Sequence, residues 1–393
     1  MRASNELDFI IIGAGIAGAS AAAHLAAHRS VALLEMESHA GYHSTGRSAA
    51  LFSQIYGNAT IRALTRASRT FLFDPAPGFS AVPLVRPRDT LYFASPDQLE
   101  VLQRFRSDAD IHAGTVELTA EQTIARVPVL LRQKVGGAAL EQGSADIDVD
   151  ALHQGFLRMA RSRGAQVHMN SPVRQLAHVN GRWALETNQG HFFAPIVINA
   201  AGAWGDELAR LAGVTPVGLQ PMRRTAMLID APAGLRSESW PASIAIDESF
   251  YFRPDAGLLL LSPADEAPWP ACDVQPEDLD VAIAVDRFEQ ATGTQVRQVK
   301  HRWAGLRVFA PDRSPVVGFD AVAPGFFWLV GQGGYGIQTA PALGRVAAAL
   351  AMDHPMPADI EQAGVSAGML SRRRLDAAFS IDTDQTVIKS SAV

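Results

Sequence analysis

The sequence predicts an α/β fold in which a Rossmann-like, dinucleotide-binding domain is interleaved with an α+β domain built on an antiparallel sheet. Three observations predict it. A strand, a glycine-rich turn, a helix and a second strand follow one another within residues 8–35. Apolar and aromatic residues alternate around a turn at 254–257, which is typical of a hairpin. A second glycine-rich segment follows an apolar strand at 326–330.

The first of these elements is a complete βαβ unit. Residues 8–13 form an apolar strand, an alanine-rich helix runs through about residue 28, and 31–35 form the next strand. Between strand and helix stands Gly13-Ala-Gly15-Ile-Ala-Gly18, where glycines permit a tight turn and close approach of the backbone to a pyrophosphate. The helix N-terminus offers unpaired N–H groups to that anion. Glu35 ends the second strand and is placed to bind ribose hydroxyls.

The middle of the chain alternates helices and strands. Ser95-Pro96 opens a helix expected over 95–108, and a second helix is expected over 150–163, capped by Asp148 or Asp150. Gly164 ends it, and a strand follows at 166–169. Next come a buried strand at 197–202 and a helix whose first residues are 206–211.

The later elements include the predicted second sheet and a second glycine loop. Residues 249–262 form the hairpin of a different domain. Gly331-Gln-Gly333-Gly334-Tyr-Gly336 has the dinucleotide spacing and precedes a helix over 338–352, but no second strand with an acidic end follows it. We therefore expect this helix N-terminus to lie against a cofactor held by the first glycine turn, where it would stabilise negative charge.

Composition excludes several classes of partner. A formal net charge of -6 and a pI near 6.0 do not favour binding to nucleic acid. The single cysteine, Cys272, excludes an internal disulfide and a multi-cysteine metal site, so we expect no metal and a reducing, cytoplasmic location. The N-terminus lacks the pattern of a signal peptide, and no apolar run reaches the roughly 18 residues of a membrane span. Peripheral membrane contact stays open.

Seven segments give the chain a resemblance to a known family. The chain resembles the D-amino-acid oxidase family of flavoproteins, and within it the D-arginine dehydrogenases, up to about residue 375. The segments are Gly41-Tyr-His-Ser-Thr-Gly-Arg-Ser-Ala-Ala50, Asp146-Ile-Asp148 with Ala151-Leu-His-Gln-Gly155, Asn199-Ala-Ala-Gly-Ala-Trp204, Pro221-Met-Arg-Arg224, Asp247-Glu-Ser-Phe-Tyr251, Trp303-Ala-Gly-Leu-Arg307 and Gly333-Gly-Tyr-Gly-Ile-Gln338.

The resemblance implies FAD as the cofactor, bound without a covalent tether because Cys272 lies outside the matching segments. We expect an FAD-binding domain made of 1–80, 145–218 and 310–378, and a substrate-binding domain made of 81–144 and 219–309. A flexible tail is expected at 379–393, because the end of the chain has few residues that could join a core. Together with the glycine fingerprint, the resemblance gives the cofactor-binding residues: Gly13, Gly15, Ile16, Ala17, Gly18, Glu35, Ser44, Thr45, Arg47, Ser48, Ala49, Ala50, Val173, Ala201, Gly202, Trp204, Gly305, Gly333, Gly334, Tyr335, Gly336, Ile337 and Gln338.

The resemblance also implies how substrate is held. Hydride transfer from an amino acid to flavin N5 requires a fixed orientation of the Cα–H bond, which a two-point grip on the carboxylate provides. Arg224, Arg307 and the Tyr251 hydroxyl would hold the carboxylate, and the Gly334 carbonyl would accept a hydrogen bond from the amine. Tyr56 would lie on a loop that closes over the pocket and excludes water. No general base is nominated, because a neutral amine releases hydride without one.

Departures from the D-arginine dehydrogenases concern the substrate side chain. Thr90 takes the place of a glutamate that pairs with a cationic tail, and Asp89 would face the other side of the strand. Leu51 replaces a histidine and Ser53 replaces a threonine. Ile244 and Gln338 complete the expected pocket. The sequence therefore favours neutral and hydrophobic D-amino acids over cationic ones.

Other functions fit the same family. The expected reaction is oxidative deamination of a D-amino acid, with hydrolysis of the imino acid to a 2-oxo acid and ammonia, and with a quinone or oxygen as electron acceptor. A sarcosine- or glycine-type amine oxidase would share fold, cofactor and carboxylate grip. A 2-hydroxy-acid dehydrogenase would need a base that the sequence does not offer. A non-catalytic flavin-binding protein is the alternative of another class.

Overall fold

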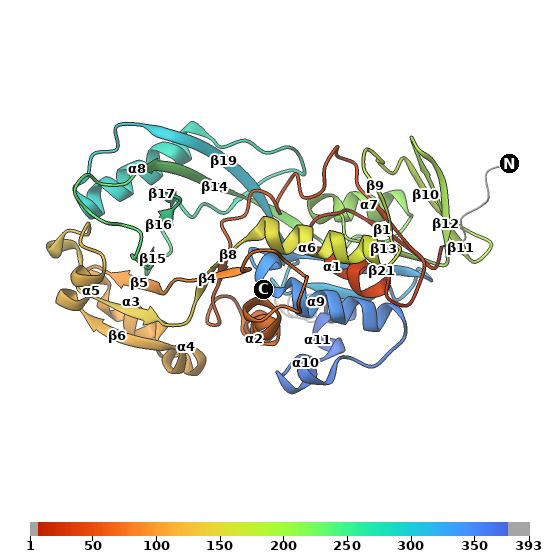
Figure 1. Ribbon diagram of the computed structural model, residues 1–393, viewed down its shortest axis with the longest axis horizontal. Helices are drawn as coiled ribbons and strands as arrows, with labels where there is room; N and C mark the ends of the chain where they lie inside the picture. Colours follow the sequence, from red (N-terminus) through yellow and green to blue (C-terminus); the bar gives the residue numbers. More distant parts are fainter. Residues whose placement is uncertain (1–6, 376–393) are drawn as a thin grey trace, which may run out of the picture.

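Two large sheets form the two ends of an elongated molecule (Figure 1). The structure is a computed structural model and describes residues 7–375. The six-stranded sheet with its helices lies on the right of Figure 1, and the ten-stranded sheet lies on the left. The expected tail at 379–393 falls outside the described residues.

The first sheet is parallel except for one edge strand, β20. Its strands, in spatial order, are β20 (Val316–Phe319), β21 (Phe326–Val330), β13 (Ile196–Asn199), β1 (Phe9–Ile12), β2 (Val31–Leu34) and β9 (Gln166–His168). Strands β1, β2 and β21 are buried along their whole length, as continuous apolar runs in a covered parallel sheet should be.

Three helices pack together beside this sheet: α1 (Ile16–Leu25), α6 (Val149–Ser162) and α9 (Gly336–Ala351). Small residues let α1 and α9 approach closely. A Cβ atom on Gly344 would lie 2.8 Å from the Cβ atom of Ser20. Buried alanines of α1 and α9 belong to one hydrophobic core with Phe156 of α6, so α1 is held between the two other helices.

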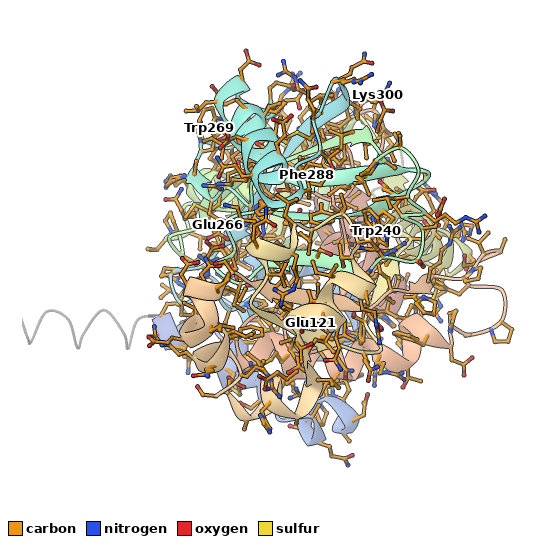
Figure 2. All side chains as sticks on the ribbon, turned by 90° about the vertical axis from the view of Figure 1, so that its left-hand side faces the viewer. Glu121, Trp240, Glu266, Trp269, Phe288 and Lys300 are labelled. Carbon is orange, nitrogen blue, oxygen red and sulfur yellow. The ribbon has the colours of Figure 1, made fainter. Side chains whose placement is uncertain are left out.

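The second sheet is antiparallel apart from the pair β15 and β5. Its strands, in spatial order, are β22 (Gln332–Gly333), β19 (Val299–Phe309), β14 (Gln220–Asp230), β17 (Leu258–Ser262), β16 (Tyr251–Asp255), β15 (Ala242–Ala245), β5 (Thr90–Ala94), β7 (Gly137–Glu141) and β6 (Thr115–Thr119), with β18 (Ala267–Pro268) beside β14. Helix α8 (Asp278–Thr292) contacts β14 and β17, and Phe288 of α8 is fully buried (Figures 1 and 2).

The two sheets meet at the second glycine segment. Strand β21 of the first sheet leads directly into β22, which pairs with β19 of the second sheet, and α9 then returns to the first. Strands β14 and β19 are 11 residues long each and pair along nearly their whole length. Residues at the β22 end of this pair therefore face the nucleotide-binding half.

The other elements surround these layers. The strands are β10 (Gln175–Val179), β11 (Arg182–Thr187) and β12 (Gly190–Ala194) in one small sheet, and β3 (Leu51–Phe52), β8 (Ala145–Ile147) and β4 (Val85–Pro87) in another. The helices are α2 (Ala59–Phe73), α3 (Leu99–Phe105), α4 (Ala109–Gly114), α5 (Ala120–Arg126), α7 (Gly205–Leu211), α10 (Ala358–Gln362) and α11 (Ala367–Leu370), with short 3₁₀ turns at Pro96–Gln98, Arg132–Lys134 and Gly202–Trp204.

The predicted fold class is confirmed, and so are the βαβ unit and the hairpin β16–β17. Asp148, not Asp150, caps α6, because its side chain accepts a hydrogen bond from the Ala151 N–H at 2.9 Å. The helix expected over 95–108 is divided into the 3₁₀ turn and α3, and α1 ends at Leu25. The division into domains at the residue boundaries given above stays a prediction.

Within residues 7–375, no helix has the length and apolar character that crossing a membrane requires. The same residues contain no group of three or more His, Cys, Asp or Glu side chains arranged to hold a metal ion.

Candidate active site

A cavity of about 600 Å³ extends between the two sheets, a volume within the range of small-molecule and cofactor sites. At one end it is lined by the turn between β1 and α1, and at the other by β14, β19 and the segment after β21. It thus connects the expected nucleotide site with the expected substrate site.

The glycine turn has no room for side chains. Gly13 has a φ of 103°, and a Cβ atom there would lie 2.4 Å from the Ala200 carbonyl oxygen. A Cβ atom on Gly18 would lie 1.9 Å from the Gly13 carbonyl oxygen. Gly15 lines the cavity, whereas Gly18 does not. Gly18 instead allows α1 to pack on the turn, which is the role of the third glycine in a dinucleotide fingerprint.

Glu35 and Thr45 hold the backbone of this turn. The buried Glu35 carboxylate accepts hydrogen bonds from the Ala14 N–H at 2.8 Å and the Glu37 N–H at 3.0 Å. The Thr45 hydroxyl accepts one from the Ile16 N–H at 3.0 Å. Both residues line the cavity, so the first turn of α1 is fixed with its N-terminus directed at the space where a pyrophosphate would lie.

The loop at 41–50 is tied to the second sheet. Ser44 donates a hydrogen bond to the Leu306 carbonyl at 2.6 Å, and Arg47 donates to the Ala304 carbonyl at 3.1 Å and the Val274 carbonyl at 2.9 Å. In return, the Trp303 indole donates to the Arg47 carbonyl at 2.9 Å. This loop therefore forms a rigid wall of the cavity between its two ends.

Arg224 and Arg307 converge at the other end. They lie on the neighbouring strands β14 and β19, where Met222 pairs with Arg307 and Arg224 with Gly305. The guanidinium group of Arg307 donates to the Tyr56 hydroxyl at 2.8 Å. Burial lowers the pKa of Arg307, but nearby Tyr56, Tyr335 and Glu266 outweigh it and the pKa is raised, so the side chain is charged. Both arginines and Tyr56 line the cavity.

A carboxylate that the sequence reading did not single out lies beside this pair. Glu266 accepts a hydrogen bond from Arg307 at 2.8 Å and one from Arg224 at 3.5 Å. It precedes β18 and is not part of the seven matching segments, so no motif pointed to it.

The wall between the two ends combines apolar and hydroxyl side chains. Thr90 is fully buried and its hydroxyl lies 2.9 Å from that of Ser144. Asp89 does not line the cavity and lies 3.7 Å from Arg126, as expected for the opposite side of the strand. Leu51 and Ile244 supply the apolar part of the wall.

Behind this wall lies a buried polar network. Ser53 donates from its hydroxyl to Glu141 at 2.7 Å and from its N–H to the Gln338 side-chain oxygen at 3.0 Å. Burial raises the pKa of Glu141 to about 7, against the opposing effect of the hydrogen bonds from Ser53 and Gln54. Among the described residues, the amide nitrogen of Gln338 has no hydrogen-bond partner although it is buried. Since Gln338 lines the cavity, this donor is free to meet a bound molecule.

The structure brings nearly all the expected site residues together. Every expected substrate residue lines the cavity, and so does every expected cofactor residue except Gly18 and Tyr335. Tyr335 is buried and packs edge to face against Tyr56, with the two ring centroids 4.8 Å apart. Tyr92 and Glu248 also line the cavity but were not expected. Tyr92 is two residues from Thr90 and lies on the same face of β5, so the two-residue period of a strand could have predicted that Tyr92 lines the cavity.

The cavity fits FAD in its shape and donor set. It offers a glycine turn with a helix N-terminus, a buried carboxylate beside that turn, and an unpaired amide donor near the start of α9. Gly305 also lines the cavity. A Cβ atom built on Gly305 would lie 3.4 Å from the Cβ atom of Arg47, so at this position backbone, and not a side chain, faces the middle of the cavity.

Comparison with known proteins gives three kinds of match. The sequence profile of the family described as DAO, FAD dependent oxidoreductase, matches residues 8–350. Mitochondrial dimethylglycine dehydrogenase of Rattus norvegicus is 25% identical over 370 residues, which cover 87% of this chain and 42% of that protein. The chain thus spans less than half the length of this relative.

Two solved structures share the fold over almost their whole length. L-proline dehydrogenase from P. horikoshii has a TM-score of 0.81 and 20% identity, with 95% of this chain and 99% of the other covered. Glycine oxidase from Geobacillus kaustophilus has a TM-score of 0.78 and 20% identity, with 89% and 95% covered. The similarity to the D-arginine dehydrogenases in particular does not emerge from these matches.

Proposed function

This chain belongs to the DAO family of FAD-dependent oxidoreductases, and on that premise we propose that it oxidises the carbon–nitrogen bond of a small amino acid. FAD is its cofactor and, when bound, accepts the two electrons of the reaction. A non-covalent mode of binding is supported by Cys272, which does not line the cavity. The residues expected to hold FAD are those of the glycine turn, Glu35, the 41–50 loop and the 333–338 segment.

The observation that carries this proposal is the pair Arg224 and Arg307. Two guanidinium groups, 17% and 12% exposed, line one end of a cavity that is otherwise largely apolar. A carboxylate is the anion that such a pair binds in two-point fashion. Gripped there, a substrate would present its Cα–H bond toward the middle of the cavity, where backbone of Gly305 and the 333–338 segment leaves room for a flat ring.

We further propose neutral or hydrophobic D-amino acids as the substrates. Thr90 offers no charge to a cationic tail and is already bonded to Ser144, and Asp89 faces away from the cavity. Leu51 and Ile244 offer apolar contact. The D configuration is supported by the resemblance of the seven segments given above. In this reaction the substrate loses a hydride from Cα and a proton from nitrogen, and water then converts the imino acid to a 2-oxo acid and ammonia.

A second candidate is the oxidation of glycine or of an N-alkylated amino acid. The names of the similar proteins favour it, since one relative is a dimethylglycine dehydrogenase and the two solved structures are a proline dehydrogenase and a glycine oxidase. The same arginine pair would bind the carboxylate of such a substrate. An N-alkylated amino acid differs from the first candidate by a carbon substituent on nitrogen, and glycine differs from it by the absence of a side chain.

The deciding experiment is anaerobic reduction of the purified flavoprotein. The protein is mixed with neutral and cationic D-amino acids, their L-enantiomers, glycine, sarcosine and 2-hydroxy acids, and the flavin absorbance is followed. Fast bleaching by D-methionine or D-phenylalanine but not by D-arginine is the expected result. Bleaching by sarcosine or glycine alone would select the second candidate, and bleaching by 2-hydroxy acids alone would exclude both. Bound flavin that no substrate reduces would indicate a non-catalytic protein.

Whether electrons then pass to a quinone or to oxygen is tested with the reduced protein. Reoxidation by a soluble quinone that is much faster than reoxidation in air-saturated buffer would identify a dehydrogenase.

A further inference from the structure

Glu266 is held in place by a well-anchored segment. The preceding residue, Asp265, accepts hydrogen bonds from the Thr225 N–H at 2.6 Å and the Thr225 hydroxyl at 3.1 Å. Its backbone carbonyl also accepts a hydrogen bond from Arg224 at 2.7 Å. Ala264, which lines the cavity, has the unusual φ of 53°. The segment is thus bound to β14, which fixes the backbone that carries Glu266, labelled in Figure 2.

Three guanidinium groups lie around one carboxylate oxygen of Glu266, Oε1. Arg307 lies at 2.8 Å from it, Arg313 at 2.9 Å and Arg224 at 3.5 Å. Arg224 and Arg307 line the cavity, whereas Glu266 and Arg313 do not. The carboxylate therefore contacts the arginine pair from outside the cavity, and a substrate carboxylate would contact the same pair from inside.

The charges at this site balance in a simple way. Arg224 and Arg307 carry two positive charges in a poorly solvated place, and Glu266 neutralises one of them. The charge of Arg313 is 45% exposed and is largely screened by solvent. Glu248 also lines the cavity, but it is exposed, so its charge is likewise largely screened by solvent. One positive charge then remains for the substrate, which matches a single carboxylate.

We propose that Glu266 restricts this site to substrates with one carboxylate, because its charge leaves only one arginine uncompensated and repels a second carboxylate. Glu266 touches neither substrate nor cofactor in this arrangement and determines specificity through the two arginines. The proposal rests on the proposed function, because it assumes that Arg224 and Arg307 bind the substrate carboxylate.

The test uses unreactive ligands, so that it does not depend on turnover. Acetate and malonate are titrated into the FAD-loaded protein, and their dissociation constants are measured from the change in flavin absorbance. In Glu266→Gln the affinity for malonate relative to acetate is expected to rise by about ten-fold, since a like charge within several ångströms of the second carboxylate is removed. The increase should shrink at high salt.

Two control variants accompany it. Glu266→Asp keeps the charge and should keep the wild-type ratio of the two dissociation constants, even if both constants rise. Glu100→Gln removes an exposed charge on α3 and should leave both constants unchanged. Flavin content and melting temperature confirm that each variant folds.

The outcomes separate this inference from the function on which it rests. If Glu266→Gln weakens acetate and malonate equally, or leaves their ratio unchanged, Glu266 only positions the guanidinium groups and the inference is wrong while the arginine grip stands. If neither ligand binds to the wild type or any variant, the carboxylate grip itself is wrong, and both proposals fall.

Discussion

The guanidinium group of Arg307 packs so closely on Gly334 that a Cβ atom built there would lie 1.9 Å from Arg307 Nη2. Arg307 cannot move away freely, because Tyr56 and Glu266 both accept hydrogen bonds from it. Glycine is therefore required at position 334 by the neighbouring side chain. The backbone of Gly334 does not have a positive φ, so a turn conformation does not explain why glycine is needed at this position.

Gly334→Ala should displace Arg307 and lower kcat/KM by about 100-fold, since small misplacements of an orienting group have effects of that size. FAD content should change much less than kcat/KM, because the glycine turn, Glu35 and the 41–50 loop, which are expected to hold the rest of FAD, are not touched. Gly368→Ala is the matched control, as its Cβ atom would find its nearest neighbour at 3.9 Å. Steady-state kinetics with full activity in Gly334→Ala would contradict the packing argument.

Tyr56→Phe removes one acceptor from Arg307 while keeping the edge-to-face contact of the ring with Tyr335. We expect KM to rise by about three- to ten-fold, the usual effect of one lost hydrogen bond, with a smaller change in kcat. Measurement of both constants over a range of substrate concentrations checks this. A drop in kcat with an unchanged KM would assign Tyr56 to closure of the cavity and not to the position of Arg307.

Glu141 should make the stability of the protein depend on pH. Burial raises its pKa from an ordinary 4.5 to about 7 in the folded state, so between these values the folded protein binds a proton that the unfolded chain does not. The contribution of this group is present below pH 4.5 and is lost as the pH rises toward 7, by on the order of 3 kcal/mol.

Glu141→Gln should abolish this dependence. The difference in free energy of unfolding between wild type and variant is measured by denaturant titration at pH 5 and pH 8, with FAD in excess. The expected result is a variant that loses less stability than the wild type over this interval. Parallel changes in the two proteins would show that Glu141 titrates normally.

Glu35→Gln should weaken FAD binding by about ten-fold or more. The amide can no longer accept at both atoms, so either the Ala14 N–H or the Glu37 N–H loses a charge-assisted hydrogen bond. Fluorescence titration of the FAD-free protein with FAD provides the dissociation constant. An unchanged constant would mean that neither the turn geometry nor a ribose contact depends on this carboxylate.

The sequence predicted those parts of the site that depend on local pattern. The glycine turn between β1 and α1 needs particular residues at fixed spacing, and so does the segment after β21. These could be found without knowing the fold. Arg224 and Arg307 were predicted through the resemblance alone, because they are 83 residues apart and no local pattern brings them together.

The parts that escaped prediction depend on tertiary packing. Glu141 stands in a strand that reads as an ordinary buried run, and only the fold places it under the Ser53 hydroxyl. Glu266 lies in an irregular segment whose course is set by the contacts of Asp265 with Thr225. Asp148 could not be distinguished from Asp150 as a cap, because the two are only two residues apart in the sequence; in the structure Asp148 is the N-cap and Asp150 lies in the first turn of the helix.

The order of strands in the first sheet also bears on how the protein is made on the ribosome. Strand β1 pairs with β13, and β13 with β21, so this part of the sheet cannot form until residues 196–199 and 326–330 have been synthesised. Pairings between such distant segments form slowly and leave apolar strand edges exposed meanwhile. The β1 edge of the βαβ unit therefore stays unpaired until residues 196–199 have left the ribosome.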